Sequence, residues 1–357
     1  MERKLASVQK IVDVAPIENA DAIERVTVLG WQCVAQKGEF EPGDRVVYCE
    51  VDSFLPIRPE FEFLRKSCYR KFSNGEEGFR IKTVRLRGQI SQGIVFPLSI
   101  LSGLRFKDDT RENPVDDFKE GMDVTGPMGV VKYEPITSLT SSGEAFGLRP
   151  VFVPKTDEMR IQSIPELLRE LEGLELYITT KADGMSCSLF WNSNHERPFG
   201  ICGRNYELRP GDDGYSKAAE KYDLENRLKA YGKNIILQGE VVGPGIQKNR
   251  LNVKDVDFLL FDVVFIDEQG RYADLEELQA VAKDLGLKTV EVCQKEIRFD
   301  SLTIDGLLEM AKGKYTGTNN NREGIVIRPC KVKYSEVLGG RLSCKVVNNE
   351  YLLKEEE

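Results

Sequence analysis

The stretch from Leu174 to Trp191 predicts two β-strands that are joined by a tight turn. The first strand ends at Lys181, the chain turns at Asp183 and Gly184, and a second apolar strand follows. An Asp-Gly turn between two apolar segments is typical of a β-hairpin, and this is the simplest interpretation of the pattern. The turn also places an amine close to a carboxylate and to a glycine that lets backbone approach a ligand. Lys181 is therefore a candidate nucleophile at the edge of a pocket.

The length and charge of the chain limit what it can do. Its 357 residues are enough for two domains that each bury a core, and 41% hydrophobic with 30% charged residues is typical of a soluble globular protein. The net charge of −8 disfavours binding of nucleic acid by the whole surface, so any such contact must come from local basic patches. No apolar run is long enough to cross a membrane, and we expect no membrane partner.

The eight cysteines are scattered and include no Cys-x-x-Cys pair. This spacing argues against a zinc site and a disulfide framework, and it is typical of a reducing compartment. The N-terminus leads into no signal-peptide core. We therefore expect an intracellular, cytoplasmic protein, and we expect it to act as a monomer.

Short apolar segments at close spacing dominate the first 124 residues. Turn residues separate these segments, and helical periodicity is almost absent. The predicted strands are 8–14, 22–29, 31–36, 46–51, 79–87 and 93–96. This pattern predicts a small β-barrel over residues 1–124. An OB-type barrel is the preferred interpretation, and an SH3-like barrel is the alternative.

A basic segment, residues 63–87, departs from the acidic composition of the chain. Single-strand binding combines basic side chains that follow phosphates with aromatic rings that stack on bases, so the segment is a candidate nucleic-acid site. Its predicted contacts are Arg65, Arg70, Lys71, Arg85 and Arg87. The aromatic residues between them are Tyr69, Phe72 and Phe79. A solvated hairpin whose aromatic residues belong to the core explains the segment equally well.

Residues 125–150 are rich in Gly, Pro and Ser and are predicted to link the barrel to a second domain, residues 151–357. In this domain strands alternate with helical segments, which predicts an α+β fold with mainly antiparallel strands. The predicted helices are 165–171, 216–231, 273–285 and 304–312, and the predicted strands include 174–180, 235–242, 257–266 and 324–329. The absence of P-loop and Gly-x-Gly-x-x-Gly motifs argues against P-loop and Rossmann folds.

Polar residues recur at or near strand ends after Lys181. Arg204 and Glu240 each follow a glycine, and Phe261 precedes an aspartate. Glu323 begins a strand, and Lys345 lies near the end of the sequence. Each residue by itself has an ordinary explanation as a surface charge, a core residue or a turn residue. Their order along the chain is more informative than any single one.

In this order the segments resemble the nucleotidyl-transfer motifs of the covalent nucleotidyltransferase superfamily, the polynucleotide ligases and mRNA capping enzymes. The resemblance covers nearly all of residues 154–351. Residues 239–248 (GEVVGPGIQK) with Phe261 and its aspartate look most like the RNA ligase 2 branch, and residues 155–162 (KTDEMRIQ) are similar to a ligase pattern. An OB-like domain in front matches a subfamily of ATP-dependent RNA ligases. One departure is Ser343, which stands where these relatives carry the first lysine of Lys-x-Lys; Arg341 is a candidate substitute.

The resemblance implies an ATP-dependent RNA ligase that uses Mg²⁺ or Mn²⁺ and joins 3′-hydroxyl and 5′-phosphate ends. AMP would bind covalently to Lys181, pass to the 5′-phosphate and leave when the 3′-hydroxyl attacks. The implied catalytic residues are Lys181, Asp183, Glu323 and Lys345. The implied nucleotide-binding residues are Arg160, Lys181, Arg204, Glu240, Phe261, Glu323 and Lys345, and a hydrated metal would be held by Asp183, Glu240 and Glu323.

The nucleophile must lose a proton before it attacks. A lysine with an ordinary pKa of ~10.4 is almost fully protonated at neutral pH. We therefore expect Lys181 to depend on cationic neighbours, Lys345 and the metal, to favour its neutral form.

Two alternatives remain open. The chain could be a DNA ligase or a capping-type enzyme that uses GTP. It could also be a nucleic-acid-binding protein with a degenerate, non-catalytic second domain. The joint presence of the two lysines and three acids argues against degeneration, and Ser343 is the one residue in its favour.

Overall fold

The computed structural model describes residues 3–72, 74–104, 118–133 and 145–355. The chain forms two compact units. Unit 1 comprises Met1–Thr137, Gln162–Pro165 and Leu352–Glu357. Unit 2 comprises Ser138–Ile161 and Glu166–Tyr351.

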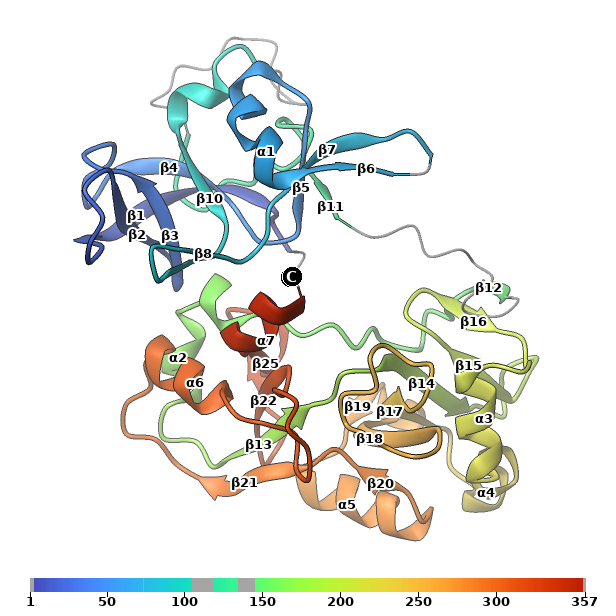
Figure 1. The fold of residues 1–357 in the computed structure, drawn as a ribbon. Helices are drawn as coiled ribbons and strands as arrows, with labels where there is room; N and C mark the ends of the chain where they lie inside the picture. The colour runs from blue at the N-terminus through green and yellow to red at the C-terminus, as the bar shows by residue number, and fades with distance from the viewer. Residues whose placement is uncertain (1–2, 73, 105–117, 134–144, 356–357) are drawn as a thin grey trace. The chain divides into compact units, whose positions relative to one another are not determined.

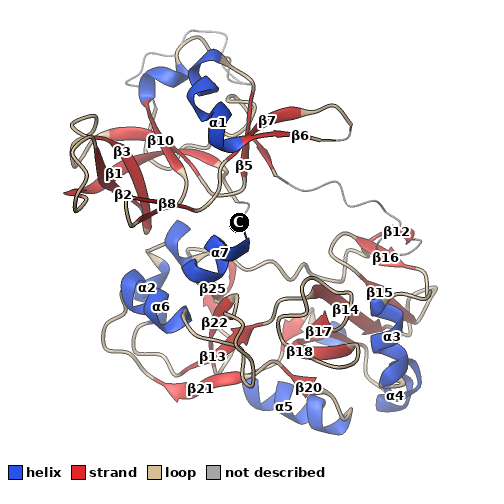
Figure 2. Ribbon diagram, viewed as in Figure 1, coloured by secondary structure: helices blue, strands red, loops and turns tan. Residues whose placement is uncertain are grey.

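Unit 1 consists mainly of antiparallel strands (Figures 1 and 2). A five-stranded sheet has the order β10-β4-β1-β2-β3, formed by β1 (Ala6–Pro16), β2 (Ile23–Val28), β3 (Trp31–Gln36), β4 (Arg45–Cys49) and β10 (Ile94–Pro97). A four-stranded sheet has the order β11-β5-β7-β6, formed by β5 (Ser53–Pro56), β6 (Tyr69–Lys71), β7 (Glu77–Arg80) and β11 (Val131–Lys132). The remaining elements are the hairpin β8 (Val84–Leu86)–β9 (Gln89–Ser91) and the short helices η1 (Pro59–Leu64), α1 (Arg65–Cys68) and η2 (Leu98–Leu101).

The long strand β1 bends the main sheet of unit 1. Its first half pairs with β4 and its second half with β2, and the register shifts between Ile11 and Asp13. Such an irregularity increases local twist and curvature. The curved sheet buries Trp31 and Tyr48 in one apolar cluster, while Phe79 lies in another.

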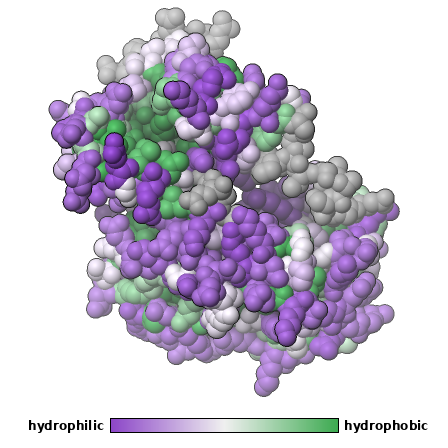
Figure 3. Space-filling view, viewed as in Figure 1, coloured by the Kyte–Doolittle hydropathy of each residue, from purple (hydrophilic) through white to green (hydrophobic). Residues whose placement is uncertain are grey.

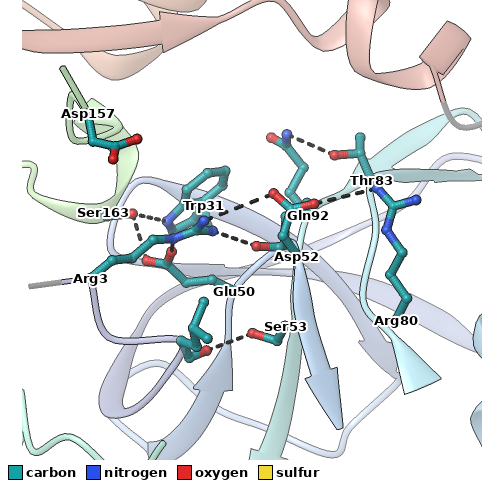
Figure 4. Close-up of polar contacts among 12 residues, drawn as sticks. Arg3, Trp31, Glu50, Asp52, Ser53, Arg80, Thr83, Gln92, Asp157 and Ser163 are labelled. Carbon is teal, nitrogen blue, oxygen red and sulfur yellow. Dashed lines mark hydrogen bonds and ion pairs between the residues drawn. The ribbon is translucent and has the colours of Figure 1, made fainter. Parts of the chain in front are cut away.

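The segment Gln162–Pro165 belongs to unit 1 although it is distant from the rest of that unit in sequence. Trp31 Nε1 donates a hydrogen bond to Ser163 Oγ (3.3 Å), and Ser163 Oγ donates to Glu50 (2.7 Å) (Figure 4). Arg3 Nε lies 2.6 Å from Glu50, so this buried carboxylate is paired with a positive charge. These contacts attach the segment to the sheet.

Part of the predicted connecting segment, residues 125–150, is folded. Met128 and Val130 are buried in the core of unit 1, and β11 pairs with β5. Strand β12 (Ala145–Leu148) pairs with β16 (Tyr206–Leu208) in unit 2. A composition rich in Gly and Pro did not distinguish short edge strands from a linker, because edge strands tolerate both residues.

Unit 2 is an α+β structure, as predicted. Its larger sheet has the order β12-β16-β15-β14-β17-β18-β19, with β14 (Met185–Trp191), β15 (Phe199–Cys202), β16 (Tyr206–Leu208), β17 (Ile235–Val242), β18 (Asp257–Phe265), β19 (Arg271–Tyr272) and, parallel to β18, β20 (Lys288–Thr289). A smaller sheet has the order β21-β13-β22-β25, with β13 (Leu176–Lys181), β21 (Val292–Ile297), β22 (Gly324–Pro329) and β25 (Cys344–Val347). The other elements of unit 2 are β23 (Tyr334–Ser335), β24 (Gly340–Arg341), η6 (Ile266–Glu268), α2 (Leu167–Leu171), α3 (Gly214–Lys221), α4 (Leu224–Tyr231), α5 (Leu275–Asp284) and α6 (Ile304–Ala311). Two short helices, η5 (Ile161–Ser163) and α7 (Asn349–Glu355), begin in unit 2 and end in unit 1.

Helices α3, α4 and α5 pack on one face of the larger sheet. Leu189, Leu237 and Leu260 of the strands share a buried apolar cluster with residues of these helices. Because successive side chains of a strand point to opposite faces, Ser186 and Glu240 point to the other face. That face carries the candidate site.

The predicted helix 216–231 is wrong as a single element. The structure contains two helices, α3 and α4, that are separated at Tyr222 and Asp223. Asp223 adopts a left-handed conformation, with φ 48°, which aspartate tolerates better than most residues and which a continuous helix cannot include.

The surface of unit 2 that Figure 3 shows is mostly hydrophilic. Among the described residues, no helix is both long enough and apolar enough to cross a membrane.

Candidate active site

The turn after Lys181 connects two sheets. Strand β13 ends at Lys181 and pairs with β21 and β22, whereas β14 begins at Met185 and pairs with β15 and β17. The hairpin interpretation of this Asp-Gly turn is therefore wrong. Gly184 is required by space, because a Cβ at this position would lie 2.3 Å from the carbonyl oxygen of Val241.

Lys181 forms an ion pair with Glu323. Lys181 is in register with Gly324, and its Nζ lies 2.7 Å from Glu323 Oε1. Tyr315 links the two residues, because its hydroxyl donates to the carbonyl of Lys181 (2.9 Å) and accepts from the N–H of Glu323 (3.1 Å). Nothing in the sequence indicated Tyr315, which lies outside the recognised motifs.

Two more predicted acids lie near the nucleophile. Glu240 is opposite Ser186, and its Cγ would lie 2.9 Å from a Cβ on Gly184. Asp183 is 6% exposed and forms an ion pair with Arg250, whose NH1 lies 2.8 Å from Asp183 Oδ2. The structure therefore brings the three predicted acids around Lys181.

The acids determine the protonation of Lys181. Burial alone would lower the pKa of Lys181, but the charges of Glu323, Glu240 and Asp183 outweigh burial and raise this pKa above its ordinary value. The pKa of Glu240 is raised to about 8, first by burial and then by repulsion from Glu323 and Asp183. In the ligand-free protein the acids therefore favour the protonated amine, and the metal expected to favour the neutral form would have to offset them.

Lys345 lies on β25, opposite Val326 of β22. Its backbone N–H donates a hydrogen bond to the carbonyl of Met159 (2.9 Å), and the backbones of Arg160 and Lys345 form an isolated parallel β-bridge. Burial, followed by repulsion from Lys181 and Arg160, lowers the pKa of Lys345 to about 7. Lys345 and Arg160 thus bring basic side chains to the site, whereas Asp183, Glu240 and Glu323 bring acidic ones.

The three carboxylates do not form a direct metal-binding site. Among the residues that the structure describes, no group of three or more His, Cys, Asp and Glu side chains is arranged to hold an ion. Glu323, Glu240 and Asp183 are nevertheless all close enough to Lys181 for their charges to raise its pKa. This arrangement fits a hydrated divalent ion, whose bound waters would contact the carboxylates.

Phe261 lies at an irregularity in the larger sheet. The register between β17 and β18 shifts there, because Gln238 pairs with Asp262 while Gly239 pairs with Leu260. The half-buried Phe261 side chain packs against a buried apolar cluster that includes Ala182, the residue after the nucleophile. The irregularity therefore places an aromatic ring beside the turn that carries Lys181.

Ser343 and Arg341 have structural partners. Ser343 is buried and accepts a hydrogen bond from Arg328 Nε (3.1 Å). Arg341 NH1 lies 2.7 Å from the buried Asp262, and its guanidinium carbon is 4.3 Å from the centre of the Tyr272 ring. Arg341 is thus held in a buried ion pair, which argues against its substituting for the missing lysine.

Arg204 lies in the exposed turn between β15 and β16. Its NH2 is 2.9 Å from Asp157 Oδ1, and both side chains are about half exposed. Asp157 acts on the pKa of Lys345, and the neighbouring Thr156 forms a hydrogen bond with Ser186 (2.5 Å). Arg204 is therefore connected to the candidate site through Asp157.

The five basic residues predicted to bind nucleic acid lie on separate segments of unit 1. Arg65 is at the start of α1 and pairs with Glu62 (2.6 Å), Arg70 and Lys71 are on β6, and Arg85 and Arg87 are at the β8–β9 hairpin (Figure 1). Lys71, Arg85 and Arg87 are exposed.

The aromatic residues of this basic segment pack against other residues of unit 1. Phe79 is fully buried, so the expectation that it stacks on a base is wrong. The Arg65 guanidinium carbon lies 5.0 Å from the centre of the Tyr69 ring, and Phe72 stacks on Tyr133 with ring centres 5.3 Å apart. These rings stabilise unit 1.

The chain combines a lysine surrounded by acids, at the junction of two mainly antiparallel sheets, with a second unit built from β-sheets. These features define the class of protein to which it is compared. Residues 174–347 match the family model described as RNA ligase, and residues 5–98 match the model of an OB-fold domain. The OB-type interpretation of the first unit is confirmed. Curated protein sequences give no match.

Solved structures of Naegleria gruberi RNA ligase are similar over the whole chain. The complex with PPi is 35% identical, covers 99% of each chain and has a TM-score of 0.84. The ligand-free aspartate-to-alanine variant covers 99% of this chain and 98% of that one, with 35% identity and a TM-score of 0.85. A glutamate-to-alanine variant with ATP and Mn covers 99% of this chain and 100% of that one, again with 35% identity and a TM-score of 0.85. The chain therefore belongs to the RNA ligase family, whose members are ATP-dependent ligases.

Proposed function

We propose that this chain joins RNA 3′-hydroxyl and 5′-phosphate ends through a covalent lysyl-AMP. The observation that carries the proposal is the contact of Lys181 with Glu323, close to Asp183 and Glu240 and near a second lysine, Lys345. The Lys181 amine would attack the α-phosphate of ATP, form a P–N bond and release pyrophosphate. AMP would then pass to the RNA 5′-phosphate, and the 3′-hydroxyl would attack that phosphate and release AMP.

The spacing of the candidate residues supports their assignment. Structures of the Naegleria ligase include variants at a lysine, at an arginine 21 residues before it, and at an aspartate 2 residues and a glutamate 142 residues after it. Arg160, Asp183 and Glu323 stand at these same separations from Lys181. The other glutamate variant lies 57 residues after that lysine, whereas Glu240 lies 59 residues after Lys181.

The acids would hold a hydrated Mg²⁺ or Mn²⁺ ion. Structures of the Naegleria ligase contain ATP or AMP together with Mn. When bound, such an ion would neutralise charge on the α-phosphate and offset the acids that now keep Lys181 protonated. Asp183, Glu240 and Glu323 would contact its water shell.

The remaining residues would bind the nucleotide. Lys345 and Arg160 supply positive charge for the α-phosphate, because binding of an anion favours their charged forms. Phe261 would stack on adenine beside the nucleophile turn. Arg204 would break its ion pair with Asp157 and bind the ribose or a phosphate of ATP.

Mass measurement tests the covalent step. Protein incubated with ATP and Mg²⁺ or Mn²⁺ should gain the mass of one AMP, and EDTA should prevent this gain. Lys181→Ala should not be modified. An unmodified wild-type protein under several metals and pH values, or a label on another residue, would refute the proposal, and labelling by GTP alone would favour a capping-type enzyme.

The basic residues of unit 1 are proposed to hold RNA. Reversing the charges of Arg70, Lys71, Arg85 and Arg87 should reduce sealing and flatten the salt dependence of RNA binding, while adenylylation of Lys181 stays normal. Reversal of four exposed lysines of unit 2 is the control for net charge; these are Lys217, Lys229, Lys233 and Lys283. Equal loss of adenylylation would instead indicate that these residues support the fold.

The sugar at the junction separates RNA from DNA ligation. The 3′-hydroxyl strand must orient its terminal ribose for attack, and the 2′-hydroxyl offers a donor and an acceptor that a protein can bind. We expect efficient sealing when the 3′-hydroxyl end carries ribonucleotides and poor sealing when it carries deoxynucleotides. Equal sealing of an all-DNA nick would favour the DNA ligase alternative.

A further inference from the structure

A loop of unit 2, residues 247–253, contacts the nucleophile turn at two points. Gln247 Nε2 donates to the carbonyl of Gly184 (3.3 Å), and Arg250 NH1 donates to Asp183 Oδ2 (2.8 Å). The partners of these contacts are 63 and 67 residues apart in sequence. The loop therefore constrains the turn through tertiary contacts.

The backbone of the 247–253 loop is strained. Gln247, Asn249 and Asn252 all have positive φ, at 47°, 44° and 52°. Asparagine tolerates this conformation, but glutamine rarely adopts it. The Asn249 side chain closes the loop, because its Nδ2 donates to the carbonyl of Val253 (2.9 Å). Such strain persists only where the surroundings maintain it, and it concentrates at functional sites.

Arg250 is fixed by two other parts of unit 2. Its guanidinium carbon lies 4.7 Å from the centre of the Tyr351 ring, and its carbonyl accepts a hydrogen bond from Asn320 Nδ2 (2.8 Å). The side chain is 13% exposed, and that of Asp183 is 7% exposed. The positive charge of Arg250 is thus held against one oxygen of a buried carboxylate.

We propose that Arg250 is a positioning residue, which orients the Asp183 carboxylate toward the hydrated metal. Arg250 donates to Oδ2 of Asp183, and this contact leaves Oδ1 of Asp183 to bind a metal-bound water. Partners of this kind hold a metal-binding side chain in one orientation, so their loss weakens metal binding without removing a ligand. The inference rests on the proposed function of Asp183.

The test compares metal binding by Arg250→Met and Arg250→Lys. Mn²⁺ is titrated into protein that holds a non-hydrolysable ATP analogue, and free Mn²⁺ is measured by electron paramagnetic resonance. Arg250→Met should weaken Mn²⁺ binding about 10- to 100-fold, and Arg250→Lys should recover part of this loss. Adenylylation of Arg250→Met should approach the wild-type rate at high Mn²⁺, which a damaged fold would not allow.

Arg271 supplies a matched control. It also pairs with a carboxylate, Glu277 (2.8 Å), and its guanidinium carbon lies 4.9 Å from the centre of the Phe265 ring. Arg271→Met should leave Mn²⁺ affinity unchanged. Tyr351→Leu, which removes the ring against Arg250, should weaken Mn²⁺ binding in the same direction as Arg250→Met but less.

Wild-type Mn²⁺ affinity in the Arg250→Met protein would overturn the inference. If this protein also sealed RNA slowly, the result would instead place Arg250 on an RNA phosphate. A wild-type protein that binds Mn²⁺ with the analogue but never forms lysyl-AMP would refute the proposed function, and the resonance measurement on the variants would still decide the role of Arg250.

Discussion

Replacing Arg328 by methionine should destabilise unit 2 strongly. Arg328 is 3% exposed, and its NH2 lies 2.9 Å from Glu158 and 3.3 Å from Asp262. It also donates hydrogen bonds to Ser343 (3.1 Å) and to the carbonyl of Phe261 (3.0 Å). Without Arg328, one arginine of this cluster, Arg341, would have to compensate the charges of both Glu158 and Asp262.

The cost follows from the charge that is left behind. Removing one partner of a buried ion pair typically costs about 3–5 kcal/mol, because the other partner stays buried without compensation. The total stability of a domain is about 5–15 kcal/mol, so much of the native margin would be lost. Burial tends to raise the pKa of Glu158, but the charges of Arg328 and Arg341 outweigh burial and lower this pKa below its ordinary value.

Tryptophan fluorescence can follow unit 2 separately. The chain has two tryptophans, Trp31 in unit 1 and Trp191 in unit 2, so urea unfolding of Trp31→Phe protein reports on Trp191. In that background Arg328→Met should lose about 3–5 kcal/mol of unfolding free energy. Arg298→Met, which removes an exposed pair with Glu175, should lose at most about 1 kcal/mol.

A second substitution distinguishes charge from packing. Adding Glu158→Gln to Arg328→Met removes one uncompensated carboxylate and should recover part of the lost stability. A loss below about 1 kcal/mol in the single variant would refute the reasoning, and so would the absence of any recovery in the double variant.

Three further predictions concern the site itself. Because the pKa of Glu240 is raised to about 8, the folded metal-free protein holds a proton that the unfolded chain releases near its ordinary pKa of ~4.3. Unit 2 should therefore lose stability as the pH rises from about 4 to 8, and urea unfolding of Glu240→Gln should not show this loss. Because the pKa of Lys345 is lowered to about 7, metal-free ATP binding measured by calorimetry should weaken above pH 7, by at most about tenfold per pH unit, and Lys345→Arg should remove this dependence. Gly184→Ala should cost about 1–3 kcal/mol in urea unfolding and slow adenylylation, because its Cβ would lie 2.3 Å from the Val241 carbonyl, whereas Gly147→Ala meets no atom within 4 Å and should be neutral.

Local patterns in the sequence determined much of unit 2. The predicted strands 235–242 and 324–329 have the same bounds as β17 and β22, because β-branched and other apolar residues dominate both segments. The order of Lys181, Glu240, Glu323 and Lys345 identified the candidate site, since such motifs depend on residue type and order and can be read along the chain.

The tertiary structure decided how these residues act. It joined β13 and β14 to different sheets, and it brought the acids close enough to raise the pKa of Lys181. Arg250, Tyr315 and Arg328 contact site residues that are 67 to 134 positions away in sequence. No local periodicity encodes such contacts, because they depend on which strands pair and on what the folded chain buries beside each charge.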